Sequence, residues 1–213
     1  MGDLSVRKLH PCLGAEFRGV DFTKPLSDNA VEEILGAWAD HLVLIFPDQP
    51  VSEEQHVDVT RFFGEPEVFH QDILKSTSVA EIFRVSNTDE DGNIVPATHP
   101  TMKQLSGARK WHTESSYREK PAVGSLLHGI EVSRTGGLTC FTNMYAVYEA
   151  LPENLKSKIE NRRARHDFEM LSRELGARKP TEEERCHACD LATARAGPSR
   201  NGPEIALYQS DLQ

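Results

Sequence analysis

A histidine and a carboxylate stand two residues apart in the stretch Trp111–Tyr117, which reads WHTESSY. If this stretch is extended, alternate side chains point to the same face, so His112 and Glu114 converge while Thr113 points away. An imidazole and a carboxylate are two of the three donors in the facial triad that holds iron(II) with open positions. The motif is short, however, and a solvated histidine and glutamate in a loop remain the alternative for the motif alone.

The composition indicates one globular domain. The 213 residues suffice for a single core, and 38% hydrophobic with 27% charged residues exclude a disordered chain. The net charge of -9 argues against nucleic acid or an anionic membrane surface as the main partner. No apolar run reaches the length of a membrane span, and residues 1–13 lack the shape of a signal peptide. We therefore expect a cytoplasmic protein, and a homo-oligomer is left open.

Two amphipathic helices are predicted in the first third of the chain. Ser27 can cap the first, whose apolar face repeats at i, i+3, i+4 and i+7. Ser52 and Gln55 can form a capping box for the second, which Gly64 ends. The expected face residues are Val31, Ile34, Leu35 and Trp38 in the first helix, and His56, Val59 and Phe63 in the second. On that helix His56 is interpreted as a surface residue and not as a metal ligand.

Strand-like and helical patterns cover most of the remaining chain. They predict strands at 13–20, 42–46, 81–87, 123–132 and 138–142, a turn at 91–93, and helices at 144–151 and 153–163. The run at 42–46 is continuously apolar and closed by Pro47, which is typical of a buried strand. Gly136 and Gly137 favour a hairpin between the last two strands. Residues 95–110 show no period, so they are expected to form a long loop.

Several longer motifs occur in one order along the chain. They are GVDFTKPL, HLVLIFPDQP and FFG in the N-terminal part, then WHTESSY, PAVGSLL and TGGLTCFTNMYAVYEALP. Together they resemble the taurine/2,4-dichlorophenoxyacetate dioxygenase family (TauD/TfdA) over about residues 13–185, with the nearer likeness to the 2,4-dichlorophenoxyacetate branch. The resemblance implies a mainly β fold with flanking helices, a double-stranded β-helix or jelly roll, which is incomplete at the C-terminus. Residues 1–185 would then be a partial domain of this family.

The resemblance also implies iron(II) and the cosubstrate 2-oxoglutarate. Oxygen would convert 2-oxoglutarate to succinate and carbon dioxide while a small organic, anionic substrate is hydroxylated. His112 and Glu114 match the first two metal ligands and form the expected catalytic pair. Glu114 stands where the family usually has aspartate, which adds a methylene to that ligand. Thr139 matches the hydroxyl that hydrogen-bonds a 2-oxoglutarate carboxylate, and an ordinary strand threonine is the alternative.

Other residues occupy positions where the family shapes its substrate pocket. They are Asn87, His99 and Arg109, and His70 could also face the pocket or the surface. The family's third ligand, a distal histidine followed by an arginine that binds 2-oxoglutarate, has no match after Glu114. The later histidines, His128, His166 and His187, do not fit its motif. We therefore expect this chain to show little or no dioxygenase turnover.

Residues 186–213 no longer resemble the family. We hypothesise that they are a family segment read in the wrong frame. Back-translation of residues 186–193, started one base later, permits AMPVTWPL, and residues 201–209 permit TGRKSLYI followed by serine. These strings resemble the family's MPPVxWPL and TGRKSLY, and a diverged tail is the alternative. Such a tail should bury little apolar area and be poorly ordered, and the missing histidine and arginine should be encoded just downstream.

The cysteines do not change this interpretation. Cys12 and Cys140 are isolated and are expected to be small buried apolar residues. Cys186 and Cys189 have C-x-x-C spacing, but a structural zinc site needs four ligands and no second pair stands nearby. We interpret this pair as incidental.

Three hypotheses follow from the sequence. The chain is an iron(II)/2-oxoglutarate dioxygenase, a catalytically inactive relative that acts at most as a binding module, or an acidic interaction domain without metal. Iron-dependent succinate formation separates the first from the others, and iron binding without turnover favours the second.

Overall fold

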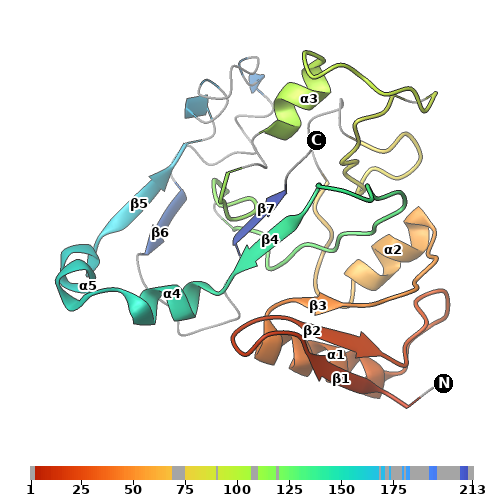
Figure 1. Ribbon diagram of the computed structural model, residues 1–213, viewed down its shortest axis with the longest axis horizontal. Helices are drawn as coiled ribbons and strands as arrows, with labels where there is room; N and C mark the ends of the chain where they lie inside the picture. Colours follow the sequence, from red (N-terminus) through yellow and green to blue (C-terminus); the bar gives the residue numbers. More distant parts are fainter. Residues whose placement is uncertain are drawn as a thin grey trace.

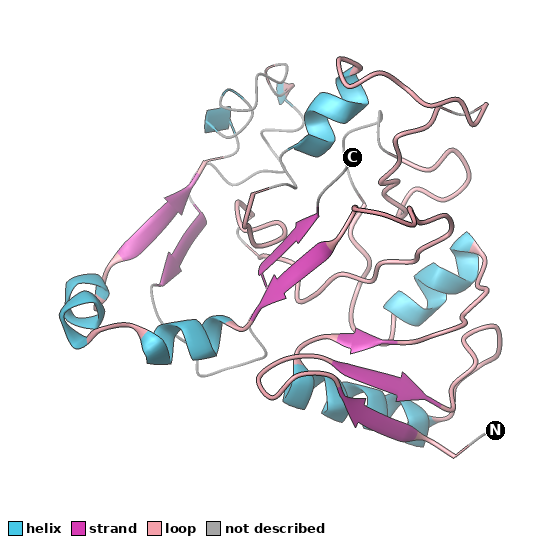
Figure 2. Cartoon of the chain, in the orientation of Figure 1, coloured by secondary structure: helices cyan, strands magenta, loops and turns pink. Residues whose placement is uncertain are grey.

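The protein forms small sheets with helices beside them, joined by long loops (Figures 1 and 2). The computed structural model describes residues 3–68, 75–89, 91–106, 110–118, 120–167, 169, 170, 173, 179, 181, 182, 192–195 and 207–210. The described strands make three separate sheets, of three, two and two strands. Sheets with flanking helices are therefore confirmed, while a continuous jelly roll is not seen among the described strands. Within these residues no helix has the length and apolarity needed to cross a membrane.

The N-terminal sheet has the order β1-β2-β3. Its strands are β1 (Ser5–Lys8), β2 (Ala15–Arg18) and β3 (Leu44–Ile45). β1 pairs antiparallel with β2, and β2 pairs parallel with β3 after the crossover helix α1 (Asp28–His41). The strand expected at 13–20 is confirmed. The strand expected at 42–46 is shortened to two residues, and it is not buried because Ile45 remains 48% exposed.

The core lies between this sheet and α1. Ala15 and Phe17 alternate with Glu16 along β2 and are fully buried, as the two-residue period of a strand requires. Phe17 packs with Ile34 of α1, and the ring of Phe46 lies 5.6 Å from that of Phe17. The N-terminal sheet and α1 therefore bury their apolar side chains against each other, within about a quarter of the chain.

Both predicted N-terminal helices are present with their predicted caps. The Ser27 side chain accepts from the backbone N–H of Ala30. Ser52 and Gln55 form both hydrogen bonds of a capping box at the start of α2 (Glu53–Thr60). α2 ends four residues before Gly64, which adopts a φ of +155°. The helix starts were thus predicted more closely than the helix ends.

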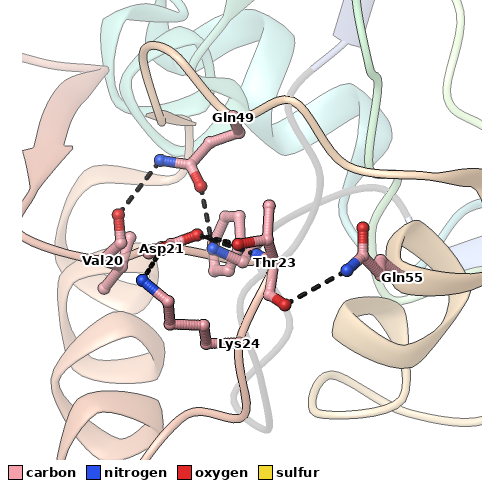
Figure 3. A network of polar contacts seen from close by, with 7 residues as sticks. Val20, Asp21, Thr23, Lys24, Gln49 and Gln55 are labelled. Atoms are coloured by element: carbon pink, nitrogen blue, oxygen red, sulfur yellow. Dashed lines mark hydrogen bonds and ion pairs between the residues drawn. The ribbon is translucent and has the colours of Figure 1, made fainter.

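Polar contacts join the end of β2 to the loop before α2 (Figure 3). The Gln49 amide donates to the carbonyls of Val20 and Pro47 and accepts from the backbone N–H of Phe22. Gln55 donates to the carbonyl of Thr23. These side-chain contacts fix the loop after β2 to residues that follow it by nearly thirty positions or more.

The later elements are short. They are α3 (Pro100–Leu105), β4 (Thr139–Thr142), α4 (Met144–Ala150), α5 (Glu153–Ile159), β5 (Arg163–His166), β6 (Ala192–Arg195) and β7 (Leu207–Ser210). β4 pairs antiparallel with β7, and β5 with β6 (Figure 1). The two helices at 144–151 and 153–163 are confirmed, although the second ends four residues early. The expected loop at 95–110 contains a short helix.

Two predicted strands are wrong. Residues 123–132 are not a strand, so the hairpin with β4 does not form and β4 pairs with β7 instead. Residues 81–87 contribute one isolated bridge, Phe83 with Lys75, and a second bridge, Thr88 with Ile94, lies just beyond them. The turn at 91–93 is present, because the Asp89 carboxylate accepts from the backbone N–H groups of Asp91 and Asn93. A strand-like composition therefore did not suffice where no neighbouring strand was available.

Two described strands, β6 and β7, belong to residues 186–213, for which poor order and little apolar burial stay predictions. Both strands lie beyond residue 185 and each pairs with an earlier strand. Cys186, His187 and Cys189 lie outside the described residues. Cys12 is exposed and Cys140 is half-buried, so the expected burial of these two cysteines is not seen.

Candidate metal site

The two side chains of the H-x-E motif meet, as their spacing predicts. His112 Nε2 lies 3.0 Å from Glu114 Oε1. Both side chains are partly buried, with 29% and 36% of their surface exposed. The two groups therefore converge on one point at the surface of the protein and do not diverge into solvent.

Both nitrogens of the His112 ring face an acceptor. Nδ1 lies 2.7 Å from the carbonyl oxygen of Lys110, and Nε2 faces Glu114. A ring that donates from both nitrogens is an imidazolium. Accordingly the pKa of His112 is raised, mainly by the hydrogen bond to Glu114 and less by the Lys110 carbonyl, while burial opposes the shift. The raised pKa therefore favours a proton on the imidazole, in the contact between Nε2 and Glu114.

This geometry suits a metal ligand in one respect. The Lys110 carbonyl engages Nδ1, so Nε2 is the nitrogen directed at Glu114. In metal sites, a histidine ligand is commonly oriented by a hydrogen bond from its other ring nitrogen to a carbonyl or carboxylate. A cation that binds His112 and Glu114 would replace the shared proton, and its binding would release that proton.

The turn that follows the motif is held by residues that sequence reasoning missed. Ser115 is 7% exposed and has a φ of +50°, and its hydroxyl donates to Glu67 Oε2 at 3.0 Å. Arg118 Nη2 lies 2.6 Å from Glu67 Oε1, in an ion pair whose angle is poor for a hydrogen bond. Arg118 directly follows the WHTESSY motif, but no local sequence pattern marks Glu67 as its partner.

One of the later histidines lies beside this turn. His166 Nδ1 of β5 is 2.8 Å from Ser116 Oγ. His128 lies elsewhere, with its ring centroid 5.9 Å from that of His56 on α2. His56 is half-buried at this contact and is not fully on the surface. Within the described residues no three histidine, cysteine or acidic side chains form a group that could hold a metal. In the described part of the chain, His112 and Glu114 thus supply two of the three donors of a facial triad.

The remaining predicted residues are not joined to this pair by any described contact. Thr139 begins β4, in register with Ser210 of β7. The ring of His99 accepts from the backbone N–H of Thr101, so it contributes to the start of α3. The backbone carbonyl of Asn87 accepts from Val95. Arg109 and His70 lie outside the described residues.

An apolar pocket lies in the N-terminal core and not at the motif. It is lined by residues of α1, α2 and their flanking loops, among them Phe22, Leu26, Val31, Ile34, Val59 and Phe63. Because this lining has no polar groups that could orient a ligand, we assign the pocket to core packing.

Comparison with known proteins identifies relatives over most of the chain. The chain is 31% identical over 173 residues to the (S)-phenoxypropionate/alpha-ketoglutarate-dioxygenase of Sphingobium herbicidovorans, covering 80% of this chain and 56% of the relative. It is 32% identical over 161 residues to the alpha-ketoglutarate-dependent 2,4-dichlorophenoxyacetate dioxygenase of Cupriavidus pinatubonensis, covering 74% and 56%. The chain thus spans a little over half the length of these curated relatives.

The fold has solved counterparts as well. The crystal structure of AAD-2 in complex with Mn(II) and N-oxalylglycine superposes with a TM-score of 0.75 at 30% identity, covering 91% of this chain and 66% of that chain. A putative alpha-ketoglutarate dependent 2,4-D dioxygenase from Burkholderia xenovorans superposes with a TM-score of 0.65 at 26% identity, covering 90% and 62%. The family model described as "Taurine catabolism dioxygenase TauD, TfdA family" matches residues 5–198, beyond the limit expected at residue 185. The chain belongs to the TauD/TfdA family of dioxygenases.

Proposed function

We propose that this chain carries the metal-binding pair of an iron(II)- and 2-oxoglutarate-dependent dioxygenase. The reaction is the hydroxylation of a small organic anion with release of succinate and carbon dioxide. The observation that supports it is the 3.0 Å contact of His112 and Glu114 within a chain of this family. Relatives named for phenoxypropionate and 2,4-dichlorophenoxyacetate support an aryloxyalkanoate as the class of substrate.

Each residue of the pair has a separate task in this proposal. His112 and Glu114 would hold the iron, which would supply the chemistry of oxygen activation. The Lys110 carbonyl keeps the imidazole oriented through Nδ1. Glu114 offsets the positive charge of the metal and accepts no proton once the metal is bound. Thr139 hydrogen-bonds a carboxylate of 2-oxoglutarate, and Asn87, His99 and Arg109 contribute to the substrate pocket of a jelly roll.

A catalytically inactive family member that binds metal is the second candidate. It is favoured by the donor set, because the described residues bring together one imidazole and one carboxylate where three protein ligands are needed. We keep the prediction that residues 186–213 are a family segment read out of frame. The nucleotide sequence tests it: a plus-one frame after codon 185 that lacks the family strings and a downstream histidine and arginine contradicts it.

The deciding experiment uses the purified 213-residue chain without oxygen and then with it. Mn(II) binding is followed by electron paramagnetic resonance, and succinate formation is followed with iron(II) and 2-oxoglutarate. Succinate that disappears in His112→Ala and Glu114→Gln but persists in His128→Ala supports the dioxygenase. Metal binding with the same dependence but without succinate supports the inactive alternative. A chain whose metal binding ignores both substitutions contradicts the proposed site.

A further inference from the structure

Glu67 connects the two ends of the turn that follows the metal-binding pair. It lies 48 residues before Ser115, yet Oε2 accepts from the Ser115 hydroxyl at 3.0 Å. Its other oxygen, Oε1, faces Arg118 Nη2 at 2.6 Å. The backbone closes the same turn, because the N–H of Arg118 donates to the carbonyl of Ser115 at 2.9 Å. One carboxylate thus contacts both residues that begin and end this turn.

The backbone at Ser115 needs such support. Its φ of +50° is in the left-handed region, which a residue with a side chain adopts at an energetic cost. A strained residue of this kind persists where its surroundings determine its conformation, and Ser115 is buried. Because Ser115 directly follows Glu114, its φ sets the direction in which the chain leaves Glu114. The contact with Glu67 therefore acts on the position of the Glu114 carboxylate.

Glu67 and Arg118 also balance each other's charge beside this turn. The Glu67 and Arg118 side chains are 29% and 19% exposed, so each partly desolvated charge has its counter-charge in contact. Burial raises the pKa of the neighbouring Tyr117, and the charges of Glu67 and Glu114 add to this effect while Arg118 opposes it. Arg118 thus offsets the negative charge of Glu67 beside this turn.

We infer that Glu67 is a positioning residue: through Ser115 and Arg118 it holds the turn that fixes the Glu114 carboxylate against His112. The part of this inference that concerns metal affinity rests on the proposed function. The part that concerns the His112–Glu114 contact does not, because that contact joins two side chains of this chain and involves no bound group. The two parts can therefore be tested separately on the same variants.

The test compares Glu67→Gln and Ser115→Gly with Glu65→Gln, a neutral change at an exposed residue of the same segment. Glu67→Gln weakens the contacts to Ser115 and Arg118. Ser115→Gly removes the hydroxyl, while glycine adopts a positive φ without strain, so this variant keeps its stability. The first measurement is nitrogen-15 NMR of the metal-free chain, which detects the ring protons of His112. The second is Mn(II) affinity by electron paramagnetic resonance, and urea unfolding verifies that each variant is folded.

Glu67→Gln and Ser115→Gly are expected to broaden or shift the Nε2 proton signal of His112 and to weaken Mn(II) binding about 10–100-fold, while Glu65→Gln changes neither. If Glu67→Gln does not fold, Ser115→Gly decides. Variants that match Glu65→Gln in both measurements overturn the inference. A changed His112 signal in a chain whose wild type binds no Mn(II) upholds the positioning role and counts against the proposed function.

Discussion

Residues 3–64 and residues 121–167 differ in how they use apolar side chains. Of the nine buried hydrophobic residues in the described chain, eight lie between Ala15 and Val59. By contrast α4 and α5 contain no buried residue, and Leu127 and Ile130 remain 70% and 83% exposed. The two regions have similar helices and strand-like stretches, so the difference lies in what covers them.

The contrast shows the effect of having the packing partner close in sequence. β1, β2, α1 and β3 are consecutive, and they form a sheet covered by a helix within 45 residues (Figure 1). An apolar face is buried only when a second layer lies on it. Residues 123–132 have a strand-like composition, but in the described chain they pair with no strand. The first region therefore contributes most of the stability, and the second depends on distant contacts.

The largest expected effect tests this contrast directly. Phe17→Ala leaves a cavity beside Ile34 and Phe46 and should lower the free energy of unfolding by about 3–5 kcal/mol. Leu127→Ala removes an exposed side chain and should change it by about 0.5 kcal/mol or less. Urea unfolding of both variants measures the difference. Equal losses would show that residues 121–138 are packed as tightly as the N-terminal core.

The next effect concerns a contact between the two regions. A Cβ at Gly124 would lie 2.7 Å from Cζ2 of Trp38, whose ring is held by Phe63 and by a hydrogen bond from Nε1 to the Leu42 carbonyl. Gly124→Ala should therefore destabilise the protein by about 1–3 kcal/mol.

Gly36→Ala is the matched control for this change, because nothing lies within 4 Å of a Cβ there and the residue is inside α1. It should stabilise the protein by about 0.4–1 kcal/mol. Both values come from thermal or urea unfolding. A neutral Gly124→Ala would mean that the two regions do not touch at Trp38.

The pH dependence of stability should show a smaller effect, at the contact between His56 of α2 and His128. Burial lowers the pKa of His56 below its usual 6.5, and the nearby His128 lowers it further, against weaker opposing effects of Leu126 and Glu53. The folded state therefore binds a proton on His56 less readily than the unfolded chain does. The stability that neutral His56 contributes is present above pH 6.5 and is lost as the pH falls below 6.5.

His56→Gln should flatten this pH dependence, and His128→Gln should reduce it in part. Urea midpoints at a series of pH values below and above 6.5 make the measurement. An unchanged pH profile in His56→Gln would remove this residue as a link between α2 and residues 121–132.

The smallest effect lies wholly inside the first region (Figure 3). Hydrogen bonds from Lys24 and Thr23 lower the pKa of Asp21 from 3.8 to about 2. Its contribution to stability is present above pH 3.8 and is lost as the pH falls through about 2. Lys24→Ala should move the pKa of Asp21 back toward 3.8, as NMR titration of the carboxyl carbon can show. A value that stays near 2 would assign the shift to Thr23 alone.

Local patterns were predictable from the sequence because the interacting groups are a few residues apart. The caps at Ser27 and Ser52 depend on residues three positions later, and the meeting of His112 with Glu114 depends on an i, i+2 spacing. In each case local backbone geometry places the two groups within reach of each other. The strands at residues 15–18 and 139–142 were also predicted, whereas residues 81–87 and 123–132 have a strand-like composition but form no strand.

The sequence by itself therefore determined the family, the helix starts and the pair His112 and Glu114. Only the tertiary structure decided how that pair is supported. Glu67 reaches Ser115 across 48 residues and His166 reaches Ser116 across 50, and no periodicity or spacing encodes either contact. Contacts of this range depend on how whole elements pack, because the chain between them can close loops of many lengths at similar entropic cost.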